Sequence, residues 1–192
     1  MSTNREEDIV TDDSGKKKVP SITIILEIVF YIAFFIAAIN VIPRYICERV
    51  DVSGPSMKNT LENGDKLIGW KLKKNYDRFD IVFFNPEEHP QEEDYIKRII
   101  GLPGETVEID EDGIIYINGE VLQEDFGKAK IKNPGLAANP ITLGEDEYFV
   151  LGDNRNNSTD SRKKIVGNVK ESDIDGIAVF RVWPLSRFGS IK

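Results

Sequence analysis

The chain of 192 residues is poor in the residue types that most often build covalent frameworks and metal sites. It has one cysteine, Cys47, and one histidine, His89. A single cysteine excludes an intramolecular disulfide framework and a cysteine-rich zinc site. A single histidine leaves little room for a Ser-His-Asp triad, and His89 sits in the charged sequence Glu-Glu-His-Pro, so we expect it to have no role. Since no phosphate-binding loop appears either, the sequence predicts no cofactor and no metal.

An excess of basic charge is also missing. The 25 Lys and Arg residues face 33 Asp and Glu residues, which gives a net charge of −8. Nucleic-acid partners favour a basic surface, so we expect no nucleic acid to bind. The hydrophobic content of 40% can fill a core, and the length suits one domain of ordinary size with appendages. The oligomeric state is left open by the sequence.

Charge is nearly absent from one long stretch near the N-terminus, Ile22–Ile42, in which only Glu27 and Asn40 are strongly polar. About 20 apolar residues suffice for a helix to cross a bilayer. A buried core helix would show a polar face, and a cleavable signal peptide has an apolar region of only about 7–15 residues. The pattern therefore predicts a transmembrane anchor over residues 21–45, preceded by a disordered tail over residues 1–20.

The charges that flank this stretch predict its orientation. Lys16, Lys17 and Lys18 precede it, while Arg44 and Arg49 follow it closely. Lysines before the span favour an N-terminus in the cytoplasm. We therefore expect a single-pass protein of the cell membrane, with residues 46–192 forming one domain outside the cytoplasm.

Beyond Arg49 no long helical period occurs, and the sequence alternates short apolar runs with turns. Asn118-Gly119 lies between two such runs, and this pair is a strong signal for a tight hairpin. The pattern predicts a mainly β fold of curled antiparallel sheets or a barrel-like arrangement. Residues 123–142 have little pattern and are expected to form a long connection. The expected strands cover residues 81–84, 95–100, 106–109, 114–117, 120–122, 148–151 and 176–183.

Three segments contain residues that could perform chemistry. Ser56 follows Gly54-Pro55, which marks either a plain turn or a turn that exposes the hydroxyl. In the strand expected at 95–100, alternation places Lys97 on one face with Tyr95. This lysine is either solvated or, if desolvated, able to lose its proton and act as a general base. Residues 152–162 follow a strand and are dense in polar side chains, which is typical of a solvated loop or of a polar site.

Taken together, these segments resemble those of the bacterial type I signal peptidases, peptidase family S26. An apolar stretch precedes Ser56-Met57, and the sequences YIKRIIGLPG at 95–104 and GDNRNNSTDSR at 152–162 follow in the family's order. The sequence RFDIV at 78–82 matches a further block of the family, although Phe79 stands where many members have glycine. The resemblance covers nearly the whole chain.

The resemblance implies a membrane-anchored serine endopeptidase that cleaves signal peptides from secreted preproteins. Ser56 would be the nucleophile and Lys97 the general base that accepts its proton. Ser158 would orient the lysine, and Asp160 and Arg162 would form a supporting ion pair. Preferred substrates would have small side chains, typically alanine, at the first and third positions before the cleaved bond. The lipid bilayer would be the second partner.

The sequence departs from some relatives at Gly54, where those relatives have a serine that helps to bind the oxyanion. Here the oxyanion would rest mainly on backbone N–H groups, including that of Ser56. Lys97 stands where the endoplasmic-reticulum type has histidine, which places the chain with the prokaryotic type. Two other readings remain: an anchored β scaffold without activity, and a self-cleaving Ser–Lys protein of related fold, which would need a DNA-binding domain in place of the anchor.

Overall fold

The computed structural model describes residues 22–85 and 94–191. Lys16, Lys17, Lys18 and His89, which entered the predictions above, lie outside these ranges. The chain divides into two units, with the boundary between Val41 and Ile42. Each unit is described separately.

The N-terminal unit contains most of a single long helix. Helix α1 spans Ile22–Tyr45, which agrees with the helix predicted over residues 21–45. Its segment Ile22–Ile42 is long and apolar enough to cross a membrane, by length and composition. Large apolar side chains along it, such as Phe30 and Phe34, are exposed. An exposed apolar surface of this kind is typical of a helix that lies in a membrane.

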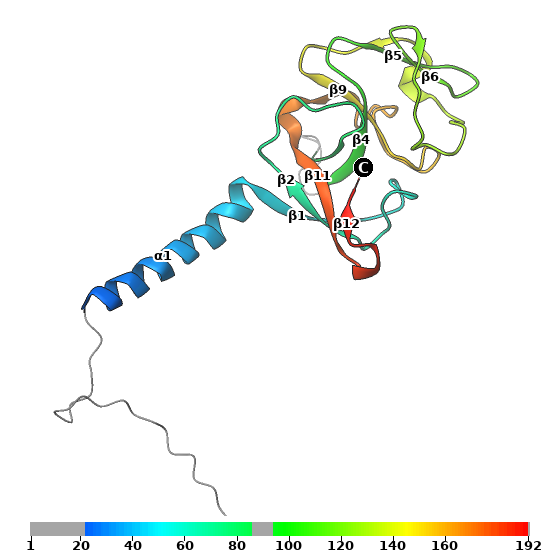
Figure 1. The fold of residues 1–192 in the computed structure, drawn as a ribbon. Coiled ribbons are helices and arrows are strands. Elements are labelled where there is room, and N and C mark those ends of the chain that lie inside the picture. The colour runs from blue at the N-terminus through cyan, green and yellow to red at the C-terminus, as the bar shows by residue number, and fades with distance from the viewer. Residues whose placement is uncertain (1–21, 86–93, 192) are drawn as a thin grey trace, which may run out of the picture. The chain divides into compact units, whose positions relative to one another are not determined.

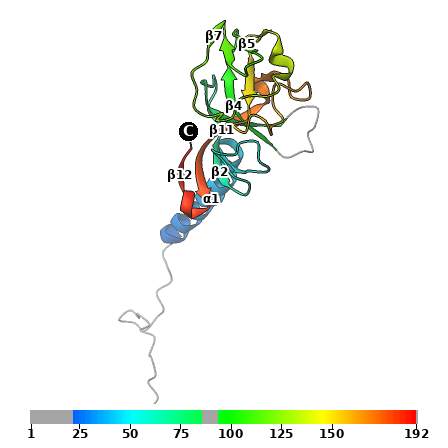
Figure 2. The same cartoon turned by 90° about the vertical axis from the view of Figure 1, so that its right-hand side faces the viewer.

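The second unit is built from strands (Figures 1 and 2). Seven of the strands form the path of a large sheet in the order β1-β2-β11-β3-β4-β9-β10, with β12 added on β11, and a smaller sheet has the order β7-β6-β5-β8. The strands are β1 (Cys47–Asp51), β2 (Lys66–Trp70), β3 (Ile81–Phe84), β4 (Tyr95–Gly101), β5 (Thr106–Ile109), β6 (Ile115–Ile117), β7 (Glu120–Val121), β8 (Ile141–Thr142), β9 (Glu147–Leu151), β10 (Val169–Lys170), β11 (Ile174–Trp183) and β12 (Gly189–Ser190), and the 3-10 helices are η1 (Gly135–Ala138), η2 (Glu171–Asp173) and η3 (Leu185–Arg187).

Every strand pair in both sheets is antiparallel. The register shifts within β11 at three places, and once in β4 between Ile99 and Gly101. Such irregularities bend a strand and increase its local twist. The large sheet is therefore curled, and the fold predicted from the sequence, a mainly β unit of curled antiparallel sheets after one apolar helix, is confirmed.

Strand β3 lies at the centre of the core because both of its faces are covered. Ile81 and Phe83 pack into one apolar cluster, and Val82 and Phe84 pack into another on the opposite face. The ring of Phe83 lies against β2 at Gly69, where an added Cβ would be 2.6 Å from the ring carbon Cζ. A continuous apolar run of this kind is typical of a strand that is buried on both sides.

The predicted hairpin is present at the expected residues. Asn118 and Gly119 have φ angles of 53° and 82°, so both take the left-handed conformation that the tight turn requires. Strands β6 and β7 pair on either side of the turn. The predicted connection from residue 123 to 142 contains only the short helix η1 and, at its end, β8.

Strand β4 positions the residues of interest. Its first residues pair with β3 on one side, whereas its pairing with β9 on the other side begins at Arg98. The segment Tyr95–Lys97 therefore has no strand partner on the β9 side among the residues described. The turn after β1 and the loop after β9 both approach this end of β4.

Candidate active site

Ser56 lies in a tight turn that follows β1 and is fixed by side chains from elsewhere in the chain. Gly54 has a φ of 78°, which glycine adopts without strain, and its N–H donates to Asn63 Oδ1 over 2.9 Å. The N–H of Asn154 donates to the Ser56 carbonyl over 2.9 Å, and the Asn154 side chain donates to the Pro55 carbonyl. These contacts hold the backbone around Ser56 through its carbonyl and leave its hydroxyl to face the cavity described below.

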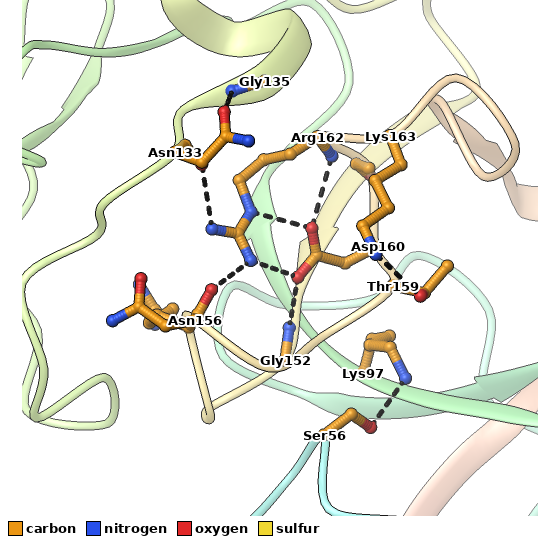
Figure 3. A network of polar contacts seen from close by, with 12 residues as sticks. Ser56, Lys97, Asn133, Gly135, Gly152, Asn156, Thr159, Asp160, Arg162 and Lys163 are labelled. Atoms are coloured by element: carbon orange, nitrogen blue, oxygen red, sulfur yellow. Dashed lines mark hydrogen bonds and ion pairs between the residues drawn. The ribbon is translucent and has the colours of Figure 1, made fainter.

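Lys97 reaches Ser56 from strand β4. Its Nζ lies 3.0 Å from Ser56 Oγ and donates a second hydrogen bond to the Ile96 carbonyl over 2.8 Å (Figure 3). The Tyr95 ring is also close, with 5.2 Å between its centroid and Nζ. Only 4% of Lys97 is exposed. The alternation predicted from the sequence, in which Lys97 shares a face with Tyr95, is confirmed.

The protonation of Lys97 follows from this burial. Desolvation lowers the pKa of Lys97 from 10.5 to about 8, and the negative charge of Asp160 opposes only part of the shift. A lysine with such a pKa is neutral in about a tenth of molecules at pH 7, far more than an ordinary lysine. The amine can therefore accept a proton from the serine hydroxyl at 3.0 Å, which an ordinary solvated lysine cannot do.

Ser56 and Lys97 line a cavity of about 830 Å³. One part of its lining is the first half of β4, and other parts are the turn around Pro55, residues 155–163 and residues 132–135. This volume is within the range of sites that hold an extended peptide segment or a small molecule. Among the residues that the structure describes, no three His, Cys, Asp or Glu side chains are grouped so as to hold a metal ion.

The loop after β9 contains a buried ion pair. Arg162 donates to both carboxylate oxygens of Asp160, through Nε and NH2, over 2.8 Å each, and the Gly152 N–H adds a third hydrogen bond (Figure 3). Burial would raise the pKa of Asp160, but the hydrogen bonds and the charge of Arg162 outweigh it and hold this pKa below its usual value. Asp160 is therefore ionised, and its charge faces the cavity that contains Lys97.

Ser158 lies in the same loop and lines the same cavity. Its hydroxyl lies beside the Asp160 carboxylate and contributes to the low pKa of that group, although Oγ makes no hydrogen bond of standard geometry to a described residue. The Ser158 hydroxyl and the Ser56 carbonyl oxygen both lie close to Gly152. A Cβ added there would lie 2.5 Å from the carbonyl oxygen and closer still to Ser158 Oγ. Glycine is thus required for the loop and the serine turn to approach.

Arg98 points to the opposite face of β4 from Lys97, as alternation predicts. It is fully buried and forms a two-fold hydrogen-bonded ion pair with Asp153, with distances of 2.9 Å from Nε and 2.7 Å from NH2. It also donates to the Phe79 carbonyl. Since Asp153 directly precedes Asn154, this pair connects β4 to the loop that holds the Ser56 turn.

The sequence of this chain has counterparts among known proteins. Residues 24–183 match the family model described as signal peptidase, peptidase S26. The chain belongs to this family. Since the match covers most of the chain, the expected resemblance is confirmed, and with it the class of enzyme, a signal peptidase of the serine endopeptidase type.

Individual relatives agree with this assignment. The chain is 35% identical to a probable signal peptidase I-1 of Synechocystis sp., over 92% of this chain and 86% of the relative. It is 37% identical to signal peptidase I P of Bacillus subtilis subsp. natto, over 83% of this chain and 91% of the relative. A crystal structure of a signal peptidase I from Enterococcus faecalis is similar at 38% identity, with a TM-score of 0.44, and covers 54% of this chain and 97% of that one.

The structure brings all of the residues that the sequence singled out into one cavity: Ser56, Lys97, Ser158, Asp160 and Arg162. Sequence reasoning missed the residues that hold them in place. Asn154 and Gly152 lie in the polar segment that was recognised, but nothing in the sequence tells which loop residues bind the serine turn. The pairing of Arg98 had a clearer signal, because an arginine in a strand that is buried along most of its length requires an acidic partner.

Phe79 is the departure from the family's pattern that the structure explains. It has a φ of 74°, where a residue other than glycine is strained, so the glycine expected here from the family resemblance would suit this backbone. Its ring packs against Phe126 with 5.1 Å between centroids, and the guanidinium of Arg98 lies 3.6 Å from the Phe126 centroid. These ring contacts place the half-buried Phe126 against Arg98 of β4.

Proposed function

We propose that this protein is a membrane-anchored endopeptidase that removes N-terminal signal peptides from exported preproteins by means of a Ser56–Lys97 dyad. The observation that carries the proposal is the 3.0 Å distance between Ser56 Oγ and the Nζ of a buried lysine whose pKa lies near 8. Nucleophilic catalysis needs an activated hydroxyl and a positioned base, and these two side chains meet that requirement.

The reaction follows from the positions of these atoms. Neutral Lys97 takes the proton of the Ser56 hydroxyl while Oγ attacks the carbonyl carbon of the bond to be cleaved. Lys97 then gives this proton to the nitrogen of the leaving peptide, so that an ester forms between Ser56 and the signal peptide. Neutral Lys97 next removes a proton from a water molecule, whose attack releases the signal peptide and restores the serine.

The charge that develops on the carbonyl oxygen needs hydrogen-bond donors. Gly54 provides no side chain for this purpose, and the hydrogen bonds that fix the turn use the Ser56 carbonyl rather than its N–H. We therefore assign the backbone N–H of Ser56 as an oxyanion donor. The negative charge of Asp160 would stabilise the protonated form of Lys97, and Arg162 would keep Asp160 ionised. The place of Ser158 in the cavity supports its role in orienting the lysine.

The peptide would bind as an additional strand. Strand β9 pairs with β4 only from Arg98 onward, and the preceding β4 residues Ile96 and Lys97 line the cavity together with Val52, Ser53 and Pro55. An extended peptide between these edges would satisfy their backbone groups and bring its carbonyl to Ser56. Small side chains, such as alanine, at the first and third positions before the cleaved bond suit this arrangement, because alternate residues of a strand face the same side.

Anchoring would bring the enzyme and its substrate to the same surface. Ser56 lies fourteen positions after Ile42, the end of the apolar segment. If α1 crosses the bilayer with the N-terminus inside, this short distance keeps the serine near the outer membrane surface, where the cleavage site of a preprotein emerges. Confinement to one surface raises the effective concentration of the two partners.

The test is cleavage of a purified preprotein by the full-length protein in detergent. The preprotein has alanine at the first and third positions before its cleavage site, and mass spectrometry locates the cut. We expect one cut after the signal peptide with the wild type and none with Ser56→Ala. An inactive wild type would favour the anchored scaffold without activity, and cleavage confined to the chain itself would favour the self-cleaving protein.

A further inference from the structure

The connection between β7 and β8 forms part of the cavity wall, although it contains little regular structure. Lys132, Asn133 and Gly135 line the same cavity as Ser56 and Lys97. A segment without strand partners needs other contacts to hold a defined position next to a substrate. Hydrogen bonds and an ion pair from the loop after β9 hold much of this segment, in addition to the buried side chain of Ile131 and the exposed Asp112–Lys130 pair.

The principal contact is a buried ion pair. Glu124 Oε2 lies 2.6 Å from Arg155 NH2, and the side chains are 12% and 1% exposed. Gly127 lies against the same guanidinium, and a Cβ added there would be 2.6 Å from its central carbon. A charge this deeply buried must be paired, and removal of either partner leaves the other uncompensated. Glu124 and Arg155 therefore fix the start of the connection on the loop.

Further contacts fix the part that faces the cavity. The side chain of Asn156 accepts a hydrogen bond from the Lys132 N–H and donates one to the Lys130 carbonyl, each over 2.9 Å. Arg162 donates to the Asn133 carbonyl over 3.3 Å, as Figure 3 shows. Asn156 thus binds the backbone as a neighbouring strand would. Asn156 and Arg162 therefore hold the segment 130–135, and the neighbouring Arg155 holds the start of the connection.

We infer that the Glu124–Arg155 pair is a positioning device for substrate binding: it holds residues 130–135 as the outer wall of the groove that receives the preprotein. This inference rests on the function proposed above and extends it to the connection. The wall lines the groove, whereas none of its residues bonds to Ser56 or Lys97. Its loss should therefore weaken preprotein binding and leave the chemical step unchanged.

The test compares Glu124→Ala with Glu124→Gln in the preprotein assay. Glu124→Ala should raise KM about tenfold with kcat changed by less than about threefold, because an interaction with bound substrate is lost rather than one specific to the transition state. Glu124→Gln keeps the size of the side chain and an acceptor for Arg155, so it should restore a large part of the affinity. The pH dependence of kcat should be that of the wild type in both variants.

Two more variants make the test specific. Asp112→Ala breaks the ion pair between Asp112 and Lys130, which belongs to the same connection but is exposed, with side chains 78% and 61% accessible. It should leave KM unchanged. Gly127→Ala places a methyl group against the Arg155 guanidinium and should raise KM as Glu124→Ala does. Combined with Glu124→Ala, it should add little, because both disturb the same contact.

Hydrogen exchange provides a measurement that does not depend on activity. The amides of Lys132 and Leu136, which donate to Asn156 and to the Arg162 carbonyl, should exchange faster in Glu124→Ala than in Asp112→Ala. Unchanged exchange together with a KM within twofold of the wild type would overturn the inference, and so would a fall in kcat with a shifted pH profile. If the wild type cleaved no preprotein, the proposed function would fail, and the exchange data would still decide whether the pair holds the wall.

Discussion

At the scale of single residues, the Lys97 side chain has to meet two requirements at once. The amine must be desolvated enough to lose its proton and must still reach Ser56 Oγ. We expect Lys97→Ala to reduce cleavage at least about a hundredfold, the scale of removing a general base. Lys97→Arg should be equally inactive because a guanidinium stays charged. Purified variants in the preprotein assay measure both effects. Substantial turnover by folded Lys97→Ala would rule out the lysine as base.

The pH dependence of cleavage follows from the same side chain. Only the neutral amine accepts the serine proton, and the pKa of Lys97 is lowered to about 8. The value of kcat/KM should therefore rise about tenfold per pH unit well below pH 8 and become constant above it. Asp160 does not titrate in this range, since its pKa lies below its usual value. A profile without an inflection between about pH 7 and 9 would contradict the assignment of the base.

Gly152 gives a second prediction at this scale. In Gly152→Ala the new methyl group would overlap the Ser56 carbonyl and the Ser158 hydroxyl, so the serine turn must move away from the loop. We expect a loss in kcat of about a hundredfold, because misplacement of a reacting group by about 1 Å has that cost.

Gly144→Ala is the matched control for this change. Its added Cβ would meet only the flexible side chain of Glu147, at 3.3 Å, and it lies outside the cavity lining. Equal activity of the two folded variants would show that the close approach at Gly152 does not position Ser56.

At the scale of secondary-structure elements, the buried pair Arg98–Asp153 joins β4 to the loop after β9. Asp153→Ala leaves a fully buried guanidinium without its carboxylate, which costs about 3–5 kcal/mol in comparable cases. Urea unfolding of the full-length protein in detergent, followed by tryptophan fluorescence, should show a loss of this size. Asp112→Ala, which breaks an exposed pair, should show no measurable loss. A change below about 1 kcal/mol in Asp153→Ala would contradict the structural role of the pair.

The elements that could be predicted from the sequence are those with their own strong pattern. The apolar run of β3 and the hairpin at Asn118-Gly119 have local causes, namely burial on both faces and a turn that needs positive φ. Strand β1 was not predicted because Cys47–Asp51 has three charged side chains and few apolar ones. Strand β2 was not predicted either, although it contains Leu67, Ile68 and Trp70. Strands of two residues, such as β8 and β12, exist only through their partners, so no local signal could reveal them.

The sequence could predict which residues form the candidate site, but not the contacts that bring them together. Alternation along β4 correctly separates Lys97 from Arg98, since this depends on a strand's period alone. The contact between Ser56 and Lys97 joins positions 41 residues apart, and only the curl of the sheet and the turn after β1 create it. The contacts of Asn154 and Glu124 are likewise long-range hydrogen bonds between loops. Propensity and periodicity contain no information about such contacts, and the family resemblance named only the residues next to the chemistry.

At the scale of the whole molecule, the proposed function depends on which side of a membrane the β unit occupies. Charge supports one orientation: three lysines precede the apolar segment of α1, whereas Arg44 and Arg49 follow it. Lys and Arg residues next to a span favour the cytoplasmic side, whereas Asp and Glu residues have little effect on orientation. The lysines should therefore keep the N-terminus inside, so that residues 46–192 lie outside.

This orientation can be measured in a bacterial host that expresses the full chain with different epitope tags at its two ends. Protease added to intact spheroplasts should remove the C-terminal tag and leave the N-terminal tag attached to a membrane-embedded fragment. Inverted membrane vesicles should give the opposite pattern, which controls for intrinsic resistance of either end. Charge reversal of Lys16, Lys17 and Lys18 to glutamate should increase the fraction with the reversed pattern, because the bias then rests only on the arginines beyond the span. Protection of the C-terminal tag in wild-type spheroplasts would place Ser56 and Lys97 in the cytoplasm. Signal peptides are not accessible to cleavage on that side after export, so the proposed function would then be wrong even if the purified dyad were active.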